Sequence, residues 1–342
     1  MEYPKFKVCV SCFTFNQSMY ITDAMNGFTM QLTSFPFVCT IVDDASTDCE
    51  QEVIRRYVED NFDFSEGSVA YHKETDYANI TYAQHKANKN CYFAVLYLKE
   101  NHYSQNKPKR VYLSEWRDIC EYEALCEGDD YWTHSGKLQM QVSFLDYHLD
   151  YGLVHTDYNL TKGKRNHNTI IYPDGKAFPD VLIRGIRVGT ATAMYRLSTY
   201  KLIPKFFLHK GWPMGDYPLW IEIAHASKIY YIPKVTANYR VLEESASHSQ
   251  DFQKLLNFHN AYCDIRKFYI EKFNVDEFID IYSATYYETI VRYACRLGRT
   301  DKARAFYCEA RRQGKVTRKC TLFYWATLIP ILKYIINIYI KI

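Results

Sequence analysis

The chain has 342 residues, of which 48% are hydrophobic and 24% are charged. This balance is typical of a globular protein and gives enough length for one large domain with an appendage. The net charge of +3 is too small to predict nucleic-acid binding by the protein as a whole. The 11 cysteines form no regular framework, which argues against a disulfide scaffold and favours reduced thiols in the cytoplasm.

The N-terminal part of the chain alternates predicted strands and helices. Residues 6–12 form an apolar run typical of a buried strand, so no signal peptide is expected before it. Apolar residues at helical spacing predict a helix over 21–31, and residues 37–42 form a second buried strand. Another helix is predicted to begin near Glu52. This order favours a parallel α/β sheet.

An acidic run from Asp43 to Asp48 follows the second predicted strand. Ligands of parallel α/β sheets bind beyond the carboxyl ends of the strands, which is where this run falls. The alternative is that Ser46, Thr47 or Asp48 caps the next helix. Both interpretations can hold together, because capping alone does not need Asp43 and Asp44 beside the cap.

The next stretch mixes polar and apolar segments. Residues 64–90 are polar and irregular, and we predict a loop or a short helix there. Residues 91–99 are apolar and predict a third strand. The basic residues 107–110 are typical of a solvated surface loop.

A second acidic run occupies the middle of the chain. A short predicted strand, 122–126, leads into Glu127-Gly128-Asp129-Asp130. Residues 137–145 then have the pattern of an amphipathic helix. Further strands are predicted over 151–156 and 188–195.

The pattern becomes helical towards the C-terminus. Gly215 and Asp216 precede an apolar helix over 219–226. Two extended pieces, 229–232 and 237–239, follow it, and residues 252–312 have helical periodicity.

The tail, residues 321–342, is strongly apolar and is preceded by basic residues. Its length is near the roughly 20 residues that a membrane span needs. Pro330, Lys333 and Asn337 interrupt it, so we predict an anchor that lies in the membrane plane and is attracted to anionic lipid. The alternative is a helix packed on the domain or on a partner.

Two adjacent carboxylates, Asp129 and Asp130, follow a buried strand. Like charges at close range raise one another's pKa, and a divalent cation removes that repulsion. Oxygen ligands suit Mg²⁺ or Mn²⁺, which can bridge a carboxylate and the diphosphate of a nucleotide sugar. Such an ion stabilises the charge that grows on the leaving group. Taken alone, an Asp-Asp pair is also typical of a solvated turn.

A transferase of this kind also needs a base that deprotonates the acceptor hydroxyl. Asp216, at the start of an apolar helix, is the best candidate because a helix N-terminus keeps a carboxylate ionised. The alternative for Asp216 is simple N-capping of that helix.

Four segments, in this order, resemble motifs of the family 2 inverting glycosyltransferases, which have the GT-A fold. They are Phe13–Asn16, Val42–Asp48, Glu127–Asp130 and Gly215–Asp216. The resemblance covers roughly residues 5–250 and implies a mixed α/β sheet flanked by helices in a domain over residues 1–250. The helical periodicity and the apolar composition divide the rest of the chain into a helical region over 251–319 and a tail over 320–342. Two longer stretches, 100–105 and 126–137, resemble a bacterial subgroup that builds surface polysaccharide. The polar stretch 64–90 departs from the family pattern.

The resemblance also implies roles for single residues. Those implied to bind the nucleotide sugar are Thr14, Phe15, Asn16, Asp43, Asp44 and Asp129. Asp44 would hydrogen-bond the base or ribose, and Phe15 would lie near a uracil-like ring. Asp130 would be the direct ligand of Mn²⁺ or Mg²⁺, Asp216 the catalytic base and His248 a late ligand of the metal or diphosphate. The alternative for His248 is a surface histidine.

The function implied is inverting transfer of a sugar, with a UDP-sugar as the expected donor, to a hydroxyl of a glycan or lipid-linked glycan at the inner face of the cell membrane. A nucleotidyltransferase is an alternative, but it would need a glycine-rich or basic loop after the first strand, and residues 14–17 offer none. A membrane-docked scaffold without catalysis is another alternative. Such a protein is expected to have lost the acidic site residues, yet Asp44, Asp130 and Asp216 are all present. The paired carboxylates of a glycoside hydrolase rarely adjoin in sequence.

Overall fold

The structure is a computed structural model. It describes residues 3–161, 164–165, 171–185, 188–205, 211–242, 249–275, 279–329 and 332. The chain forms two compact units. The first unit consists of residues 1–177, 186–208 and 219–240, and the second of residues 178–185, 209–218 and 241–342.

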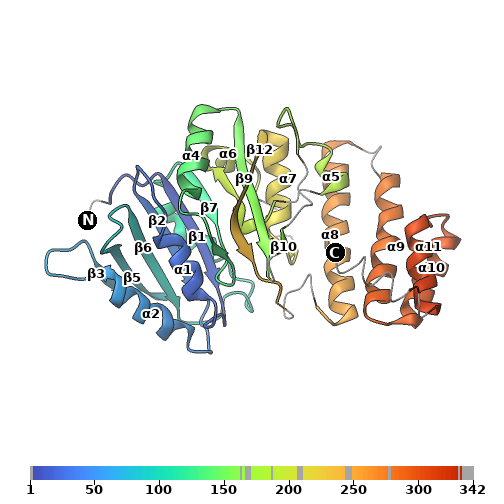
Figure 1. Cartoon of the computed structure of the whole chain (residues 1–342), viewed down its shortest axis with the longest axis horizontal. Helices are drawn as coiled ribbons and strands as arrows, with labels where there is room; N and C mark the ends of the chain where they lie inside the picture. Colours follow the sequence, from blue (N-terminus) through green and yellow to red (C-terminus); the bar gives the residue numbers. More distant parts are fainter. Residues whose placement is uncertain are drawn as a thin grey trace. The chain divides into compact units, whose positions relative to one another are not determined.

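The first unit is built on one sheet of mixed direction (Figure 1). Its central strands are β6 (Cys91–Leu98), β2 (Phe37–Asp43), β1 (Val8–Thr14) and β7 (Tyr122–Leu125). These four strands lie side by side in this order and run parallel. Their carboxyl ends therefore meet at one edge of the sheet. The sequence predicts this arrangement for β1, β2 and β6.

One flank of the sheet corrects the prediction for residues 64–90. That stretch forms β4 (Tyr71–Glu74) and β5 (Ala78–His85), and β5 pairs antiparallel with β6. A two-residue strand, β3 (Phe62–Asp63), closes this flank. In β5 the buried Ile80 and Tyr82 alternate with less buried polar residues. A strand that is buried on one face only has this mixed composition, which is why it resembles a loop in sequence.

The other flank contains four further strands. They are β11 (Met194–Arg196), β9 (Tyr151–Leu160), β12 (Lys228–Tyr239) and β8 (Tyr131–Trp132), in this order beyond β7. A short strand, β10 (Lys164–Arg165), pairs with β9. β11 is antiparallel to both β7 and β9, whereas β12 runs parallel to β9. The carboxyl end of β12 therefore points to the same edge as those of the central strands.

Two predictions for this flank need correction. The strand expected over 188–195 is only the short β11, because residues 190–192 form a turn of 3-10 helix, η2 (Thr190–Thr192). The two extended pieces 229–232 and 237–239 belong to the single strand β12. Its pairing with β9 shifts register between Tyr231 and Val235, where Pro233 cannot donate a ladder hydrogen bond.

Helices cover both faces of the sheet. On one face, α1 (Ile21–Thr29), α2 (Glu50–Asn61) and α4 (Lys137–Tyr147) pack their apolar side chains against β1, β2 and β6 in the main core. Short helices contribute to the rest of the unit: η1 (Arg110–Leu113), α3 (Ser114–Arg117) and α6 (Leu197–Leu202). The predicted α/β class is confirmed.

The second unit is helical, which confirms the prediction for residues 252–312. Its helices are α5 (Val181–Arg184), α8 (Phe252–Phe273), α9 (Ile279–Arg296), α10 (Thr300–Arg312) and α11 (Arg318–Leu328). α7 (Asp216–Ala226) begins in this unit and continues into the first. In the part of the chain that the structure describes, no helix is both long and apolar enough to cross a membrane.

Candidate active site

The turn after β1 is hydrogen-bonded to the turn after β2. The backbone N–H of Asn16 donates to Ser46 Oγ at 2.9 Å, and the side-chain oxygen of Asn16 accepts from the backbone N–H of Thr47 at 2.8 Å. The backbone N–H of Ser18 donates to Asp48 Oδ2 at 2.9 Å. The first two predicted motifs are therefore one structural element, and the polar side chains 46–48 link the turns instead of capping α2 alone.

Glu50, the first residue of α2, lies buried beneath these turns. Its carboxylate accepts from Thr14 Oγ1, from the backbone N–H of Gln17 at 3.0 Å and from Ser46 Oγ at 2.8 Å. Burial raises the pKa of Glu50, and these hydrogen bonds oppose that rise. The sequence analysis did not single out this residue, because its partners become neighbours only in the folded chain.

The second acidic run meets the same turn. The backbone N–H of Gly128 donates to Phe13 O at 3.2 Å. A Cβ atom added at Gly128 would lie 2.2 Å from Thr14 Oγ1 and 2.6 Å from Gln17 Oε1. Only glycine allows this close approach, so the acidic run and the turn after β1 are held in contact.

Asp130 is 2% exposed. Its carboxylate oxygen Oδ1 accepts a hydrogen bond from the backbone N–H of Arg240 at 2.8 Å. Burial, and then the charge of Asp129, raise the pKa of Asp130 to about 8. Burial also raises the pKa of Asp129. This pair of carboxylates is therefore costly to ionise, and a bound cation would offset that cost.

Arg240 follows β12 and holds the acidic run from the other side. Its Nη1 donates to Asp129 O at 2.7 Å, and its Nη2 forms an ion pair with Asp23 of α1. The guanidinium lies 5.0 Å from the ring centroid of Tyr20 and 4.5 Å from that of Tyr131. No site role was predicted for Arg240, and only its place after a predicted extended segment could have indicated one.

Asp44 is fully buried, and its donors come from the segment after β6. Its carboxylate accepts from the backbone N–H groups of His102 at 2.7 Å and Tyr103 at 3.1 Å. Lys109 Nζ lies 2.7 Å from Asp44 Oδ2. The basic residues 107–110 are thus not simply a solvated loop, which corrects the prediction. Contact between Asp44 and a base or ribose stays a prediction.

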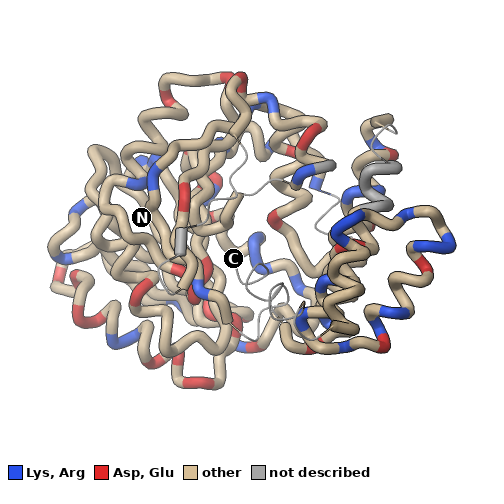
Figure 2. Tube along the Cα trace, turned by 45° about the vertical axis from the view of Figure 1, so that its right-hand side comes forward, with Lys and Arg blue, Asp and Glu red and all other residues tan. Residues whose placement is uncertain are grey.

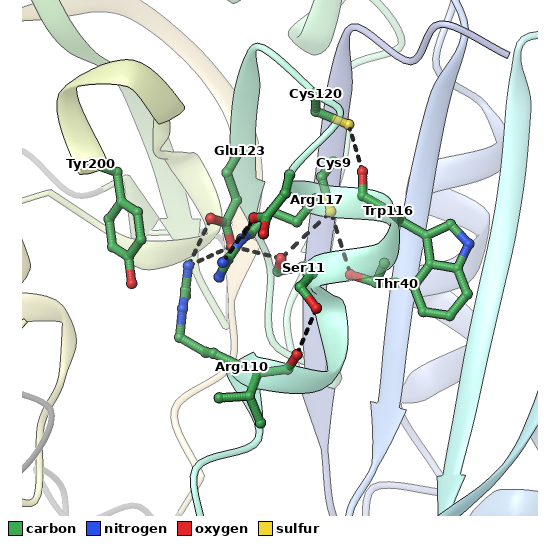
Figure 3. A network of polar contacts seen from close by, with 12 residues as sticks. Cys9, Ser11, Thr40, Arg110, Trp116, Arg117, Cys120, Glu123 and Tyr200 are labelled. Carbon is green, nitrogen blue, oxygen red and sulfur yellow. Dashed lines mark hydrogen bonds and ion pairs between the residues drawn. The ribbon is translucent and has the colours of Figure 1, made fainter. Parts of the chain in front are cut away.

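The next residue, Arg110, anchors the same segment to the centre of the sheet (Figure 3). Its Nη2 lies 2.6 and 2.7 Å from the two carboxylate oxygens of Glu123, a fully buried residue of β7. Ser11 Oγ and the hydroxyl of Tyr195 donate to the same carboxylate at 2.7 and 2.5 Å. The ring of Tyr200 lies 5.4 Å from the guanidinium. This network fixes the position of the neighbouring Lys109.

Asp43 is also fully buried. Its Oδ1 accepts from the backbone N–H of Ser46 at 3.2 Å and from Gln51 Nε2 at 2.6 Å, whereas Oδ2 has no partner among the described residues. Burial raises the pKa of Asp43. Phe15 differs from the buried Thr14 before it, because Phe15 is 42% exposed in the turn. Its ring is therefore open to a ligand.

The fit of the site to a metal ion depends on its oxygen donors. Among the described residues, no group of three or more His, Cys, Asp or Glu side chains is arranged to hold a metal. Mg²⁺ is nevertheless commonly bound by only one or two carboxylates together with substrate phosphates and waters. Asp129 and Asp130 match that smaller set. His248, the other predicted ligand, lies outside the described residues.

Asp216 lies in the second unit, where it is the first residue of α7. Its Oδ1 accepts from the backbone N–H of Tyr217 at 2.8 Å. The ring of Tyr217 stacks on that of Tyr262 of α8, with ring centroids 4.6 Å apart, and Arg266 Nε donates to the hydroxyl of Tyr217 at 3.1 Å. The start of α7 is thus anchored to α8. The role of Asp216 as the base stays a prediction.

Comparison with known proteins gives a distant relative in sequence. No family model matches the chain. An uncharacterised protein of Mycobacterium tuberculosis is 28% identical over 272 residues, which cover 75% of this chain and 62% of that protein. An uncharacterised protein of Mycobacterium bovis matches equally well. The chain therefore spans less than two thirds of the length of these relatives.

Among solved structures, S. aureus TarS matches 96% of this chain and 52% of its own, with a TM-score of 0.51 and 15% identity. A fragment, TarS 1-349 in complex with UDP-GlcNAc, has a TM-score of 0.49 at 15% identity, with 94% of this chain and 90% of that one covered. The mannosyltransferase PcManGT from Pyrobaculum calidifontis, in complex with GDP-Man and Mn²⁺, has a TM-score of 0.46 at 13% identity, with 100% and 89% covered. At these identities the likeness to TarS shows a shared fold.

Proposed function

We propose that the protein is a metal-dependent glycosyltransferase that uses a nucleotide-diphosphate sugar. The observation that supports this most directly is the meeting of the turns after β1 and β2 with the acidic run 127–130 at the carboxyl edge of the parallel strands. That edge is where ligands of such sheets bind. The shared fold with TarS, a fragment of which is known in complex with UDP-GlcNAc, is consistent with the proposal.

The donor would lie along the turn after β1. Phe15 has the exposed ring that can stack on a base, and Asp44 with Lys109 offers an acceptor and a donor that can read its edge. We assign Thr14, Asn16 and Asp43 to the support of this turn as well as to the donor site. The base is proposed to be uracil.

Asp130, supported by Asp129, would hold Mn²⁺ or Mg²⁺. When bound, the ion would act as a Lewis acid on the diphosphate and stabilise the leaving nucleotide. The chain's own contribution is to keep two carboxylates together in a buried position through the N–H and guanidinium of Arg240. His248 is proposed as a further ligand.

Asp216 would take the proton of the acceptor hydroxyl while that oxygen attacks the anomeric carbon, so the configuration would invert. The acceptor is proposed to be a glycan or a lipid-linked glycan of bacterial surface polysaccharide, at the inner face of the cell membrane. These assignments, and membership of family 2, rest on the four motifs in order. If Asp216→Asn kept near-normal turnover, the assignment of the base would be wrong.

Thermal unfolding with a panel of nucleoside diphosphates and nucleotide sugars, each with and without Mn²⁺, tests the proposal. A ligand at about 100 times its Kd adds roughly 2.7 kcal/mol of stability, which should raise Tm by several degrees. We expect one nucleotide to give this shift only when Mn²⁺ is present, and Asp130→Asn to abolish it. No metal-dependent shift with any nucleotide would refute the proposal.

A further inference from the structure

The last helix of the second unit, α11, exposes apolar side chains. Leu322, Trp325 and Leu328 are 47%, 48% and 45% exposed, and Ile329 at its C-terminal end is 38% exposed. A helix on a water-facing surface normally presents polar residues outwards. α11 has the opposite arrangement over most of its length.

Packing fixes which side of α11 faces outwards. Cys320 and Ala326 are buried, and Tyr324 stacks on Tyr307 of α10 with ring centroids 4.2 Å apart. Arg318, Leu322 and Trp325 follow a spacing of four and then three residues, which places them on one face of a helix. Ile329 directly follows the helix with an extended backbone and is also exposed. The face cannot turn inwards without breaking the contacts on the opposite side.

The sequence just before α11 and at its start is strongly basic; Figure 2 marks the Lys and Arg positions along the Cα trace. Five basic residues precede or begin α11: Arg311, Arg312, Lys315, Arg318 and Lys319. The last acidic residue of the chain is Glu309, so residues 310–342 contain no Asp or Glu. Basic residues and exposed apolar residues are therefore combined in one short region, and the sequence 310–342 that contains most of it has no acidic residue.

We propose that the outer face of α11, Arg318, Leu322, Trp325 and Ile329, docks on an anionic phospholipid bilayer. Basic side chains attract anionic headgroups, and an indole ring favours the interface between headgroups and acyl chains. The 11 residues of α11 span only about 16 Å, so this helix would lie in the plane of the interface. A second copy of the chain would bring the same basic residues against one another, so an anionic surface is the better match.

None of these residues belongs to the candidate active site. Membrane binding can therefore fail while glycosyl transfer stands, and the reverse also holds. The inference deepens the proposed location of the enzyme at the membrane but does not depend on catalysis.

Flotation of the full chain with vesicles tests the proposal. We expect binding to vesicles of phosphatidylcholine mixed with phosphatidylglycerol, weak binding to phosphatidylcholine alone, and loss of binding in high salt. The double variant Arg318→Gln with Lys319→Gln should bind the mixed vesicles roughly 25-fold more weakly, since each removed charge accounts for about fivefold. Trp325→Glu with Leu322→Glu should weaken binding by at least that factor.

Matched controls separate this face from general effects. Leu202→Glu changes an 84% exposed leucine of the first unit, and Lys302→Gln removes an exposed charge of α10. Both should bind vesicles as the unchanged chain does, and circular dichroism should be the same for all variants. Equal binding to neutral and mixed vesicles, or unchanged binding of the α11 variants, would overturn the proposal.

Two further measurements identify another occupant. A dimer in solution that Trp325→Glu dissociates, without vesicle binding, would show that a second copy covers the face and would overturn the proposal. Deleting residues 333–342 should leave vesicle binding of the face in place. If that deletion abolishes binding while the α11 variants do not, the tail is the anchor and the assignment to α11 is wrong.

Discussion

The two acidic pairs of this chain follow strands of the same sheet but differ in how the fold surrounds them. Asp44 accepts two backbone N–H groups and pairs with Lys109. Asp130 is almost as buried, yet among the described residues one backbone N–H, that of Arg240, donates to its carboxylate, and the pKa of this carboxyl is raised to about 8. Asp44 is therefore stabilised by the chain itself, whereas Asp130 is left in need of a cation.

The largest expected effect is on the second pair. Asp130→Asn should lower the rate of sugar transfer by roughly 10³-fold, because the leaving nucleotide would lose the stabilisation that a bound ion supplies. The free energy of unfolding should stay the same or rise, since the change removes a buried carboxyl that is costly to ionise. Initial rates and urea unfolding measure the two effects.

Asp43→Asn makes the same chemical change on the first pair. Because Asp43 is assigned to the donor site, this variant should weaken nucleotide binding but keep the dependence of the Tm response on Mn²⁺. If both variants lose that response equally, the contrast between the pairs is wrong.

The next largest effect is expected on the free energy of unfolding when Asp44 of the first pair is replaced. Asp44→Asn leaves Lys109 half-buried without its carboxylate, and breaking such a pair costs about 3 kcal/mol. Lys109→Met breaks the same pair from the other side and should cost a similar amount in urea unfolding. If Asp44→Asn left stability unchanged and removed only nucleotide binding, Asp44 would be a ligand contact and not a structural one.

Gly128 lies against the turn after β1, and its replacement tests the contact between this turn and the second pair. Gly128→Ala should destabilise the protein by about 2 kcal/mol, because a Cβ would lie 2.2 Å from Thr14 Oγ1. Gly215→Ala is the control, since nothing lies within 4 Å of a Cβ at that position. Equal unfolding free energies for the two variants would contradict the close approach.

Apolar runs and motif order were enough to predict the central strands and both acidic turns. The runs that became β1, β2 and β6 are buried on both faces, so their composition is distinctive. The half-buried β5 has no such run and was predicted as a loop. Local composition reveals strands only where both faces are apolar.

The residues that support the site were harder to predict for a different reason. Glu50 is distant in sequence from Thr14, whose hydroxyl donates to it, and Lys109 and Arg240 are distant from the carboxylates they contact. Each has an ordinary local explanation: a helix start, a surface loop and the end of a strand. Only the fold brings Arg240 to the acidic run across 110 positions of sequence.

Arg240 sharpens the comparison because it contacts both residues of the second pair. Arg240→Lys keeps the backbone N–H to Asp130 but loses the guanidinium bond to Asp129 O. We expect the Kd of the nucleotide in the presence of Mn²⁺ to rise about tenfold, which corresponds to one such charged hydrogen bond, with little change without Mn²⁺. Arg117→Lys, on α3, is the control. A metal-independent loss would show that Arg240 supports the nucleotide and not the acidic run.

The smallest effect extends the comparison to a second lysine. Lys137 follows the second pair in the chain and is fully buried. Its Nζ lies 2.7 Å from Gln141 Oε1 and 4.3 Å from the ring centroid of Trp132, and neither of these two partners is a carboxylate. Burial lowers the pKa of Lys137 to about 7. Between this value and the usual pKa near 10.5, the unfolded chain binds more protons than the folded one, so stability from this residue rises with pH.

The difference in unfolding free energy between the unchanged chain and Lys137→Met should therefore grow in favour of the unchanged chain by about 1 kcal/mol from pH 7 to pH 8. Below pH 7 the difference should be constant, since the lysine is then charged in both states. A pH-independent difference for Lys137→Met would mean that this lysine stays charged in the folded protein, and that the second pair lies in a more polar region than its burial indicates.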